Sequence, residues 1–347
     1  MSRVWIVITG VLLLLGAGVQ DKPRVQPNRA DEPMAKAFSL KKSVAFLDDA
    51  SRRWRKTYGC VTCHTNGLFL ISRPLVSKTH AANTSNRAFA KSYLKRYVVD
   101  DEKPKRGKGA IEGIVATTSF LAISDMATNG RLDKVTIRGL DHIWKKQAED
   151  GAWGGWLKCN WPPFEVDDHF GATLVAVAVG AVPGSYRRTK KAKEGVRKLL
   201  GWLRAHPPAN SHNKGMMLWA AAKLPEVVPA KLQKKWRDEL LALQREEGGW
   251  RLVDLGAGKW KRGKDDAKKL TVDAYATGFA IFVLRKAGVP ADDERITKGL
   301  AWLRAHQRRS GRWFVRSPKK DGKHFISHAA TQFAVMAFLA CGETTKK

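Results

Sequence analysis

The sequence contains few acidic residues for its length. Among its 347 residues, 32 Asp and Glu stand against 63 Lys and Arg, and the formal net charge is +31. This imbalance predicts attraction to an anionic partner, such as a membrane surface, an acidic polymer or an acidic redox protein. A generally basic surface is the alternative, because Lys and Arg are spread along the whole chain. No nucleic-acid recognition motif is visible, so a nucleic acid is not expected as the partner.

Long apolar runs are missing once the N-terminal region is passed, so no later segment is expected to span a bilayer. Arg3 is followed by an apolar run at 4–15 and by small residues at 16–18, which is the layout of a secretory signal. A clean cleavage site and a cysteine for lipid attachment are both lacking, so residues 1–20 are either a signal peptide or an uncleaved anchor. Both alternatives predict an exported protein of the periplasm or cell envelope. Residues 21–40 mix proline with charge and are expected to form a flexible tether.

Strand signals are scarce, and helical periodicity covers most of the chain. The helices form six pairs, at 41–57 with 64–78, 84–98 with 110–127, 133–148 with 167–182, 189–206 with 211–224, 229–245 with 271–288 and 292–308 with 326–342. The first helix of each pair is amphipathic, whereas the second is apolar on nearly every face and must be buried. The pattern predicts an all-α fold, an (α/α)6 toroid of two concentric rings, as one domain over 41–342 with a tail at 343–347. An open superhelix of the same hairpins is the alternative.

An internal repeat marks three of these hairpins. The motif Gln-x3-Gly-x-Trp occurs at Gln147, Gly151 and Trp153, at Gln244, Gly248 and Trp250, and at Gln307, Gly311 and Trp313. Gly permits a turn, Trp covers a helix end and Gln can bond free backbone groups, so the motif predicts a stabilised corner. Followed by an apolar helix, it resembles the QW repeat of squalene–hopene cyclases and the wider terpenoid cyclase and protein prenyltransferase toroids. The resemblance covers 133–342 and implies the fold, but this fold carries several functions.

The family's catalytic motifs are matched only in part. Class II cyclases protonate their substrate with the middle aspartate of Asp-x-Asp-Asp, and the similar stretch here runs from Glu165 to Asp168. The resemblance implies that Asp167 is the general acid, whereas the simpler alternative is that Asp167 or Asp168 caps the next helix. The inner helices hold few aromatic residues, which counts against the cyclisation of a carbocation.

Zinc chemistry of the prenyltransferase kind is not expected. Those enzymes hold zinc with an Asp-x-Cys pair and a distant His, and the corresponding positions here are Asp273, Tyr275 and His328. Tyr275 replaces the thiolate that zinc favours. Asp273 and His328 are therefore expected to be a helix cap and a polar residue at a helix end.

Only four cysteines are present, and two of them belong to the stretch Cys60-Val61-Thr62-Cys63-His64. This is the attachment pattern of one covalent haem c, with thioethers from Cys60 and Cys63 and His64 as an axial iron ligand. The motif stands where the repeat would have its Trp, so His64 is expected at one mouth of the toroid. A disulfide between the two thiols and half of a zinc site are the alternatives. Cys159 and Cys341 are not expected to join them.

The sixth iron ligand is predicted among histidines near the starts of inner helices, namely His169, His212 or His328; Met216, Met217 and His80 are further options. The first hypothesis is thus an exported c-type protein that transfers electrons or binds a small apolar ligand in the toroid. The alternatives are an isoprenoid or squalene cyclase that uses Asp167, and a lyase or hydrolase of an acidic polysaccharide. No catalytic pair for the last is apparent in the sequence.

Overall fold

The structure is a computed structural model, and it describes residues 27–100, 110–153, 162–164, 166–260, 271–318 and 325–345. The export segment expected at 1–20 lies outside these ranges. In the part of the chain that is described, no helix is both long and apolar enough to cross a membrane.

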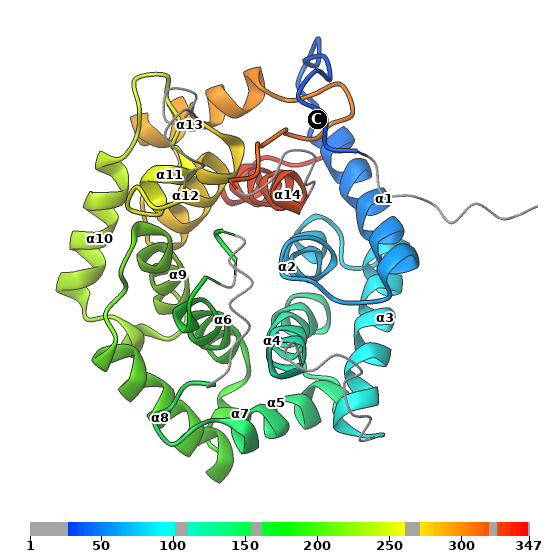
Figure 1. Cartoon of the computed structure of the whole chain (residues 1–347), viewed down its shortest axis with the longest axis vertical. Coiled ribbons are helices and arrows are strands. Elements are labelled where there is room, and N and C mark those ends of the chain that lie inside the picture. The colour runs from blue at the N-terminus through cyan, green and yellow to red at the C-terminus, as the bar shows by residue number, and fades with distance from the viewer. Residues whose placement is uncertain are drawn as a thin grey trace, which may run out of the picture.

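Six helical hairpins follow one another around a ring, with one helix of each on the outside and one on the inside (Figure 1). The outer helices are α1 (Leu40–Tyr58), α3 (Ala81–Val98), α5 (Lys134–Lys146), α8 (Lys190–Ala205), α10 (Ala230–Ala242) and α13 (Glu294–Ala305). The inner helices are α2 (Asn66–Val76), α4 (Ala110–Asn129), α6 (Asp168–Ala181), α9 (Ser211–Ala221), α12 (Ala274–Lys286) and α14 (Phe325–Ala340). Three short helices lie in the connections, α7 (Gly184–Arg187), the 3-10 helix η1 (Pro225–Val227) and α11 (Leu252–Leu255).

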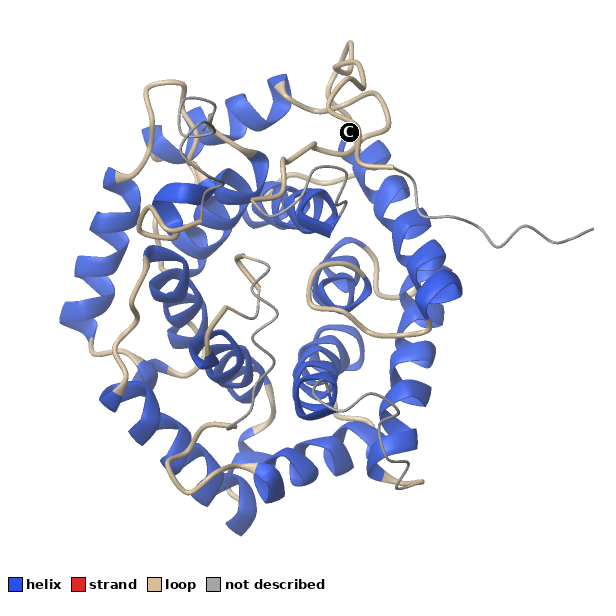
Figure 2. Ribbon diagram, in the orientation of Figure 1, coloured by secondary structure: helices blue, strands red, loops and turns tan. Residues whose placement is uncertain are grey.

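The predicted all-α toroid is confirmed, and the predicted helix bounds agree with the observed ones within three residues. The ribbon contains helices and loops without a strand among the described residues (Figure 2). The inner ring is buried, as its apolar sequence requires: in α6 every residue from His169 to Gly180 is buried. The outer helices bury one face only, as in α8, where Leu199 and Leu203 face inward.

The Gln-x3-Gly-x-Trp corners join the two rings. In each corner the Trp indole donates to a backbone carbonyl of the preceding outer helix, from Trp153, Trp250 and Trp313 to Ile143, Leu240 and Leu303 at 2.8, 2.7 and 2.8 Å. The glycines have φ values of 104°, 94° and 92° for Gly151, Gly248 and Gly311, which lie in the region that favours glycine. The stabilising role predicted for the motif is therefore confirmed.

The glutamine of each corner also reaches the next outer helix. Gln147 donates to Gly195 O of α8 at 2.9 Å, and Gln244 donates to Arg295 O of α13 at 2.7 Å. Gln307 of the last hairpin reaches α1 of the first, since its amide donates to Ser39 O at 2.9 Å and accepts from Ser39 N at 2.8 Å. The third corner thus closes the ring.

Residues 27–39, the described part of the stretch 21–40 that was expected to be a flexible tether, pack on this closure. Glu32 forms an ion pair with buried Arg312 at 2.6 Å, and Met34 pairs with Arg308 in an antiparallel backbone bridge. Phe38 packs against the apolar core. The prediction failed because composition alone does not show that one carboxylate has a buried cationic partner far along the chain.

Candidate functional sites at one mouth of the toroid

All six inner helices start at the same end of the toroid, because each follows an outer helix that runs the opposite way. The residues singled out in the sequence therefore lie around one mouth. Contacts between neighbouring first turns confirm this: Thr65 bonds His328, Asp167 bonds Asn213, and His212 bonds Tyr275. The positions of these residues near helix starts indicated that they lie at one mouth. They did not indicate which of the side chains contact each other.

The loop that carries Cys60, Cys63 and His64 is held in one conformation by Asn66. The Asn66 side chain accepts from Thr62 N at 3.1 Å and donates to Cys60 O at 2.8 Å. His64 Nδ1 lies 2.7 Å from the Thr65 hydroxyl, and His328 Nδ1 lies 3.0 Å from the same oxygen. A single buried hydroxyl thus orients two imidazole rings, His64 from the haem motif and His328 from α14.

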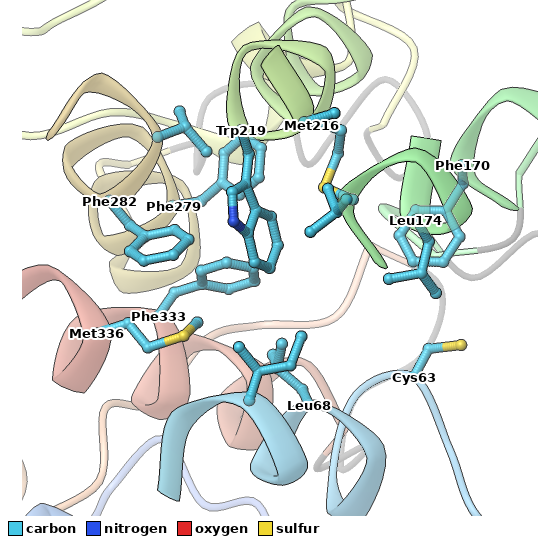
Figure 3. Packing of buried hydrophobic residues seen from close by; sticks show 14 of the residues in the cluster. Cys63, Leu68, Phe170, Leu174, Met216, Trp219, Phe279, Phe282, Phe333 and Met336 are labelled. Carbon is cyan, nitrogen blue, oxygen red and sulfur yellow. The ribbon is translucent and has the colours of Figure 1, made fainter. Parts of the chain in front are cut away.

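The two thiols of this loop are not joined by a disulfide. Cys63 is buried at the edge of the apolar interior, on the side of Leu68, Phe170 and Leu174 (Figure 3). Cys60 is half-buried, and this burial raises the pKa of its thiol although the Trp54 indole opposes the shift. Among the described side chains, no group of three or more His, Cys, Asp or Glu could hold a metal ion, so a zinc half-site finds no completion there.

The donor set itself suits a c-type haem. Metal-ligating histidines hold their second ring nitrogen in a hydrogen bond, and the contact of His64 Nδ1 with Thr65 leaves Nε2 as the nitrogen that would face iron. Cys60 and Cys63 would supply the thioethers. The chemistry that such a group supplies is one-electron transfer or ligand binding at iron.

The other proposed iron ligands have different surroundings. His212 is fully buried, with Nε2 2.9 Å from the Tyr275 hydroxyl and its ring stacked on Phe279 at 4.4 Å. Burial lowers the pKa of His212 to about 3, so the ring is neutral at ordinary pH. His169 lies beside Trp202 of α8, and burial lowers its pKa as well. The remaining options are also engaged in the fold: Met216 and Met217 are buried in the core, and His80 caps α3.

Asp167 acts as a helix cap, as the simpler alternative proposed. One carboxylate oxygen accepts from Phe170 N at 3.1 Å, and the other accepts from the Asn213 amide at 3.0 Å. Glu165 of the partial cyclase motif lies outside the described residues. Phe164 lies over the inner ring beside the Asp167 turn, with its ring 5.8 Å from those of Phe170 and Tyr275.

Apolar side chains project into the interior behind this mouth (Figure 3). Phe279, Phe333 and Met336 come from α12 and α14, and Met216 and Trp219 come from α9. Trp219 is the most exposed of these five, at 8%. Solvent therefore has almost no access to these five side chains.

A separate cavity of about 340 Å³ opens beside the mouth, between α11, the start of α12 and the segment 313–318. Aromatic side chains line it from Trp260, Trp302, Trp313 and Phe314, and charged or titratable ones from Arg251, Asp273, His306, Arg308 and Arg316. The cavity was not expected from the sequence, and Asp273 was expected only as a helix cap. The signal that was present is the cluster of Arg and aromatic residues directly after the second and third corners.

Asp273 is the cap of α12 and also part of the cavity wall. Its carboxylate accepts from Ala276 N at 2.9 Å and from Leu252 N at 2.6 Å. Burial raises the pKa of Asp273 to about 6 despite these amides. Burial would raise the pKa of nearby Asp254 too, but its bonds to Arg251 and Arg245 outweigh that effect and lower it.

Comparison with solved structures finds the same fold at low sequence identity. A polysaccharide lyase superposes with a TM-score of 0.53 at 12% identity, over 87% of this chain and 96% of that chain. A glycosidase gives 0.55 at 10% identity, over 87% and 97%. The type II terpene cyclase MstE from Scytonema gives 0.52 at 12% identity, over 86% and 96%. A scan against protein-family models gives no match, and neither does a search of curated proteins.

These likenesses agree with the terpenoid cyclase resemblance of the repeats as far as the fold is concerned. The same toroid carries enzymes named for polysaccharides and enzymes named for terpenes. Function must therefore be argued from the side chains of this chain.

Proposed function

We propose that the protein binds an acidic saccharide in the cavity lined by Arg251, Asp273, Trp302 and Arg316. The observation that carries this proposal is the combination of guanidinium groups with aromatic rings in one cavity of about 340 Å³. Guanidinium groups match the geometry of carboxylates, and ligand sites combine apolar and aromatic walls with a few placed polar groups.

The cavity wall contains both cationic and aromatic residues. Trp302 is stacked on His306 with ring centroids 4.0 Å apart, which holds both rings in place in the wall. Arg251 is fixed by its two bonds to Asp254, at 2.8 and 2.9 Å. Arg316 is exposed on the last corner segment. A sugar can therefore lie against an aromatic surface while its carboxylate meets an arginine.

The charge of the whole chain supports an anionic ligand of polymeric size. A net charge of +31 raises the local concentration of a polyanion around the molecule. Export, predicted from residues 1–20, would bring the protein to extracellular polymers. The fold likeness to a polysaccharide lyase and a glycosidase is compatible with this ligand class.

The test is calorimetric binding of tetragalacturonate, with neutral cellotetraose as the comparison. We expect the acidic sugar to bind more tightly, and we expect Arg316→Ala and Trp302→Ala each to weaken binding by about tenfold or more. Arg138→Ala, on the outer ring in a second basic groove with Lys145 and Lys198, is the matched control. Equal binding of both sugars, or equal weakening by the control, would contradict the proposal.

We also propose a c-type haem on Cys60, Cys63 and His64, because Thr65 orients His64 and His328 together. The test is expression with a c-type maturation system, followed by a pyridine haemochrome spectrum of the denatured protein. The expected spectrum is that of a covalently attached haem, and it should be lost in the variant with both Cys60→Ala and Cys63→Ala. Colourless matured protein would remove this second site.

Asp167 as a cyclase acid is less well supported. Asp167 caps α6 and is not among the residues that line the cavity of about 340 Å³.

A further inference from the structure

This inference rests on the proposed saccharide site and concerns what that site does to its ligand. Among the cavity-lining residues of the described chain, Asp273 supplies the one carboxyl group. It is fixed from two sides, by an amide of α12 and an amide at the start of α11. A carboxyl group held by backbone rather than by a flexible partner keeps its position as a ligand enters.

The charged or titratable groups that line the cavity with Asp273, or act on it as Asp254 does, come from three elements. Arg251 precedes α11 and Asp254 lies on it. His306 lies at the end of α13, and Arg308 and Arg316 lie in the last corner segment. Asp254 is paired with Arg251, so its charge is neutralised nearby. Burial raises the pKa of Asp273 to about 6, and a carboxyl group with this pKa can take up and release a proton near neutral pH.

The number of carboxyl groups discriminates between two ways to cleave a glycan. Hydrolysis of a glycoside by acid and base generally uses a pair of carboxyl groups on the two sides of the bond. Syn elimination from a uronate, whose C5–H and C4–O bonds lie on the same face of the ring, can use one group that takes and returns a proton, together with a cation on the sugar carboxylate. The described wall of the cavity offers one carboxyl group and several arginines.

We propose that Asp273 is the catalytic residue of a lyase that cleaves a uronate-containing polysaccharide by β-elimination. The Asp273 carboxylate takes the C5 proton of the uronate, the C–H electron pair forms the C4–C5 double bond, and the C4–O bond breaks. The leaving oxygen takes the proton from the Asp273 carboxylic acid, which restores the carboxylate. No water is consumed. Arg251 and Arg316 hold the sugar carboxylate and stabilise the charge that develops on it.

The experiment follows binding and cleavage of 1,4-linked polyglucuronate separately, because the C5–H and C4–O bonds of glucuronate lie on the same face of the ring. We expect wild type to release products that carry the C4–C5 double bond, seen by their ultraviolet absorbance and by a mass lower by one water than that of hydrolysis products. Asp273→Asn should bind a glucuronate tetrasaccharide within about threefold of wild type and cleave the polymer about 100-fold more slowly or worse. The rate of wild type should rise as the pH passes through about 6, where Asp273 loses its proton.

Asp167→Asn is the matched control, because Asp167 caps α6 as Asp273 caps α12 but lies outside the cavity lining. It should cleave like wild type. Asp273→Glu is the second variant if Asp273→Asn fails to fold, and it should shift the pH profile of the rate.

The outcomes distinguish failure of the lyase inference from failure of the proposed saccharide binding. If wild type does not bind the acidic sugar, the proposed function fails. If it binds without cleaving, releases hydrolysis products, or cleaves equally well as Asp273→Asn, the lyase inference is overturned while the binding site stands.

Discussion

At the scale of single residues, the mouth of the toroid is a set of buried titratable groups whose environments differ sharply. His212 is held neutral between Tyr275 and Phe279, whereas Asp273 sits where its proton is retained to about pH 6. Both residues lie at the first turn of an inner helix. In both cases burial disfavours the charged form, which lowers the pKa of the His212 imidazole and raises the pKa of the Asp273 carboxyl group.

His212 is expected to make the stability of the fold depend on pH in the acid range. Its pKa falls from the usual 6.5 in the unfolded chain to about 3 in the native protein, so the unfolded state binds the proton first. The free energy of unfolding therefore falls as the pH drops below 6.5, by about 5 kcal/mol at most at the acid end. Urea unfolding at pH 7 and pH 4.5 should show this loss.

His212→Gln should remove most of that pH dependence, because glutamine does not titrate in this range and can still bond the Tyr275 hydroxyl. The exposed His206→Gln is the control and should leave the dependence in place. Parallel loss of stability in wild type and His212→Gln would show that other groups cause the acid sensitivity.

At the scale of helices, close packing of the inner ring depends on small residues. Gly278 of α12 meets the backbone of α14, where a Cβ at this position would lie 2.6 Å from Ala334 N and 2.8 Å from Phe333 C. Backbone atoms cannot move aside as a flexible side chain can, so any larger residue would push the two helices apart.

Gly278→Ala is expected to lower the free energy of unfolding by about 1 to 3 kcal/mol. Gly201 of α8 offers a matched control, because a Cβ there would meet nothing within 4 Å and the position is helical. Gly201→Ala should raise the stability by about 0.5 to 1 kcal/mol. Chemical unfolding of the two variants measures both changes, and equal effects would contradict the packing argument.

Much of the fold could be predicted from the sequence because its signals are local. The apolar stretch of α6 and the corner from Gln147 to Trp153 each specify their own structure through periodicity and turn chemistry. The saccharide cavity could not be predicted in the same way, since its wall combines Arg251, Asp273 and Arg316 from separate segments. The cap role of Asp273 was visible, but its exposure to a cavity depends on packing.

At the scale of the whole molecule, the ring is closed by one glutamine. Gln307 is 1% exposed and bonds Ser39 and Ser43, which precede it by 268 and 264 residues. The same contact in the other corners joins hairpins that are neighbours in the sequence. Closure of this ring is therefore a long-range event that depends on a few buried hydrogen bonds.

Gln307→Ala should lower the free energy of unfolding by about 2 to 3 kcal/mol, because it leaves several buried backbone and hydroxyl groups without their partner. Gln244→Ala, whose contact with Arg295 O is exposed, should cost about 1 kcal/mol. Thermal and urea unfolding of both variants gives the comparison. If Gln244→Ala lowered the free energy of unfolding more than Gln307→Ala, the buried hydrogen bonds of the last corner would not be the stronger contribution.

The cavity lies against this closure, since Met34 and Arg308 pair backbone to backbone and both contribute to its wall. The cavity wall therefore combines residues that lie far apart in the sequence, and its complete form requires that the ring be closed. A ligand bound in this cavity would contact residues on both sides of the junction between the first and last hairpins. Its binding should therefore stabilise the closed ring.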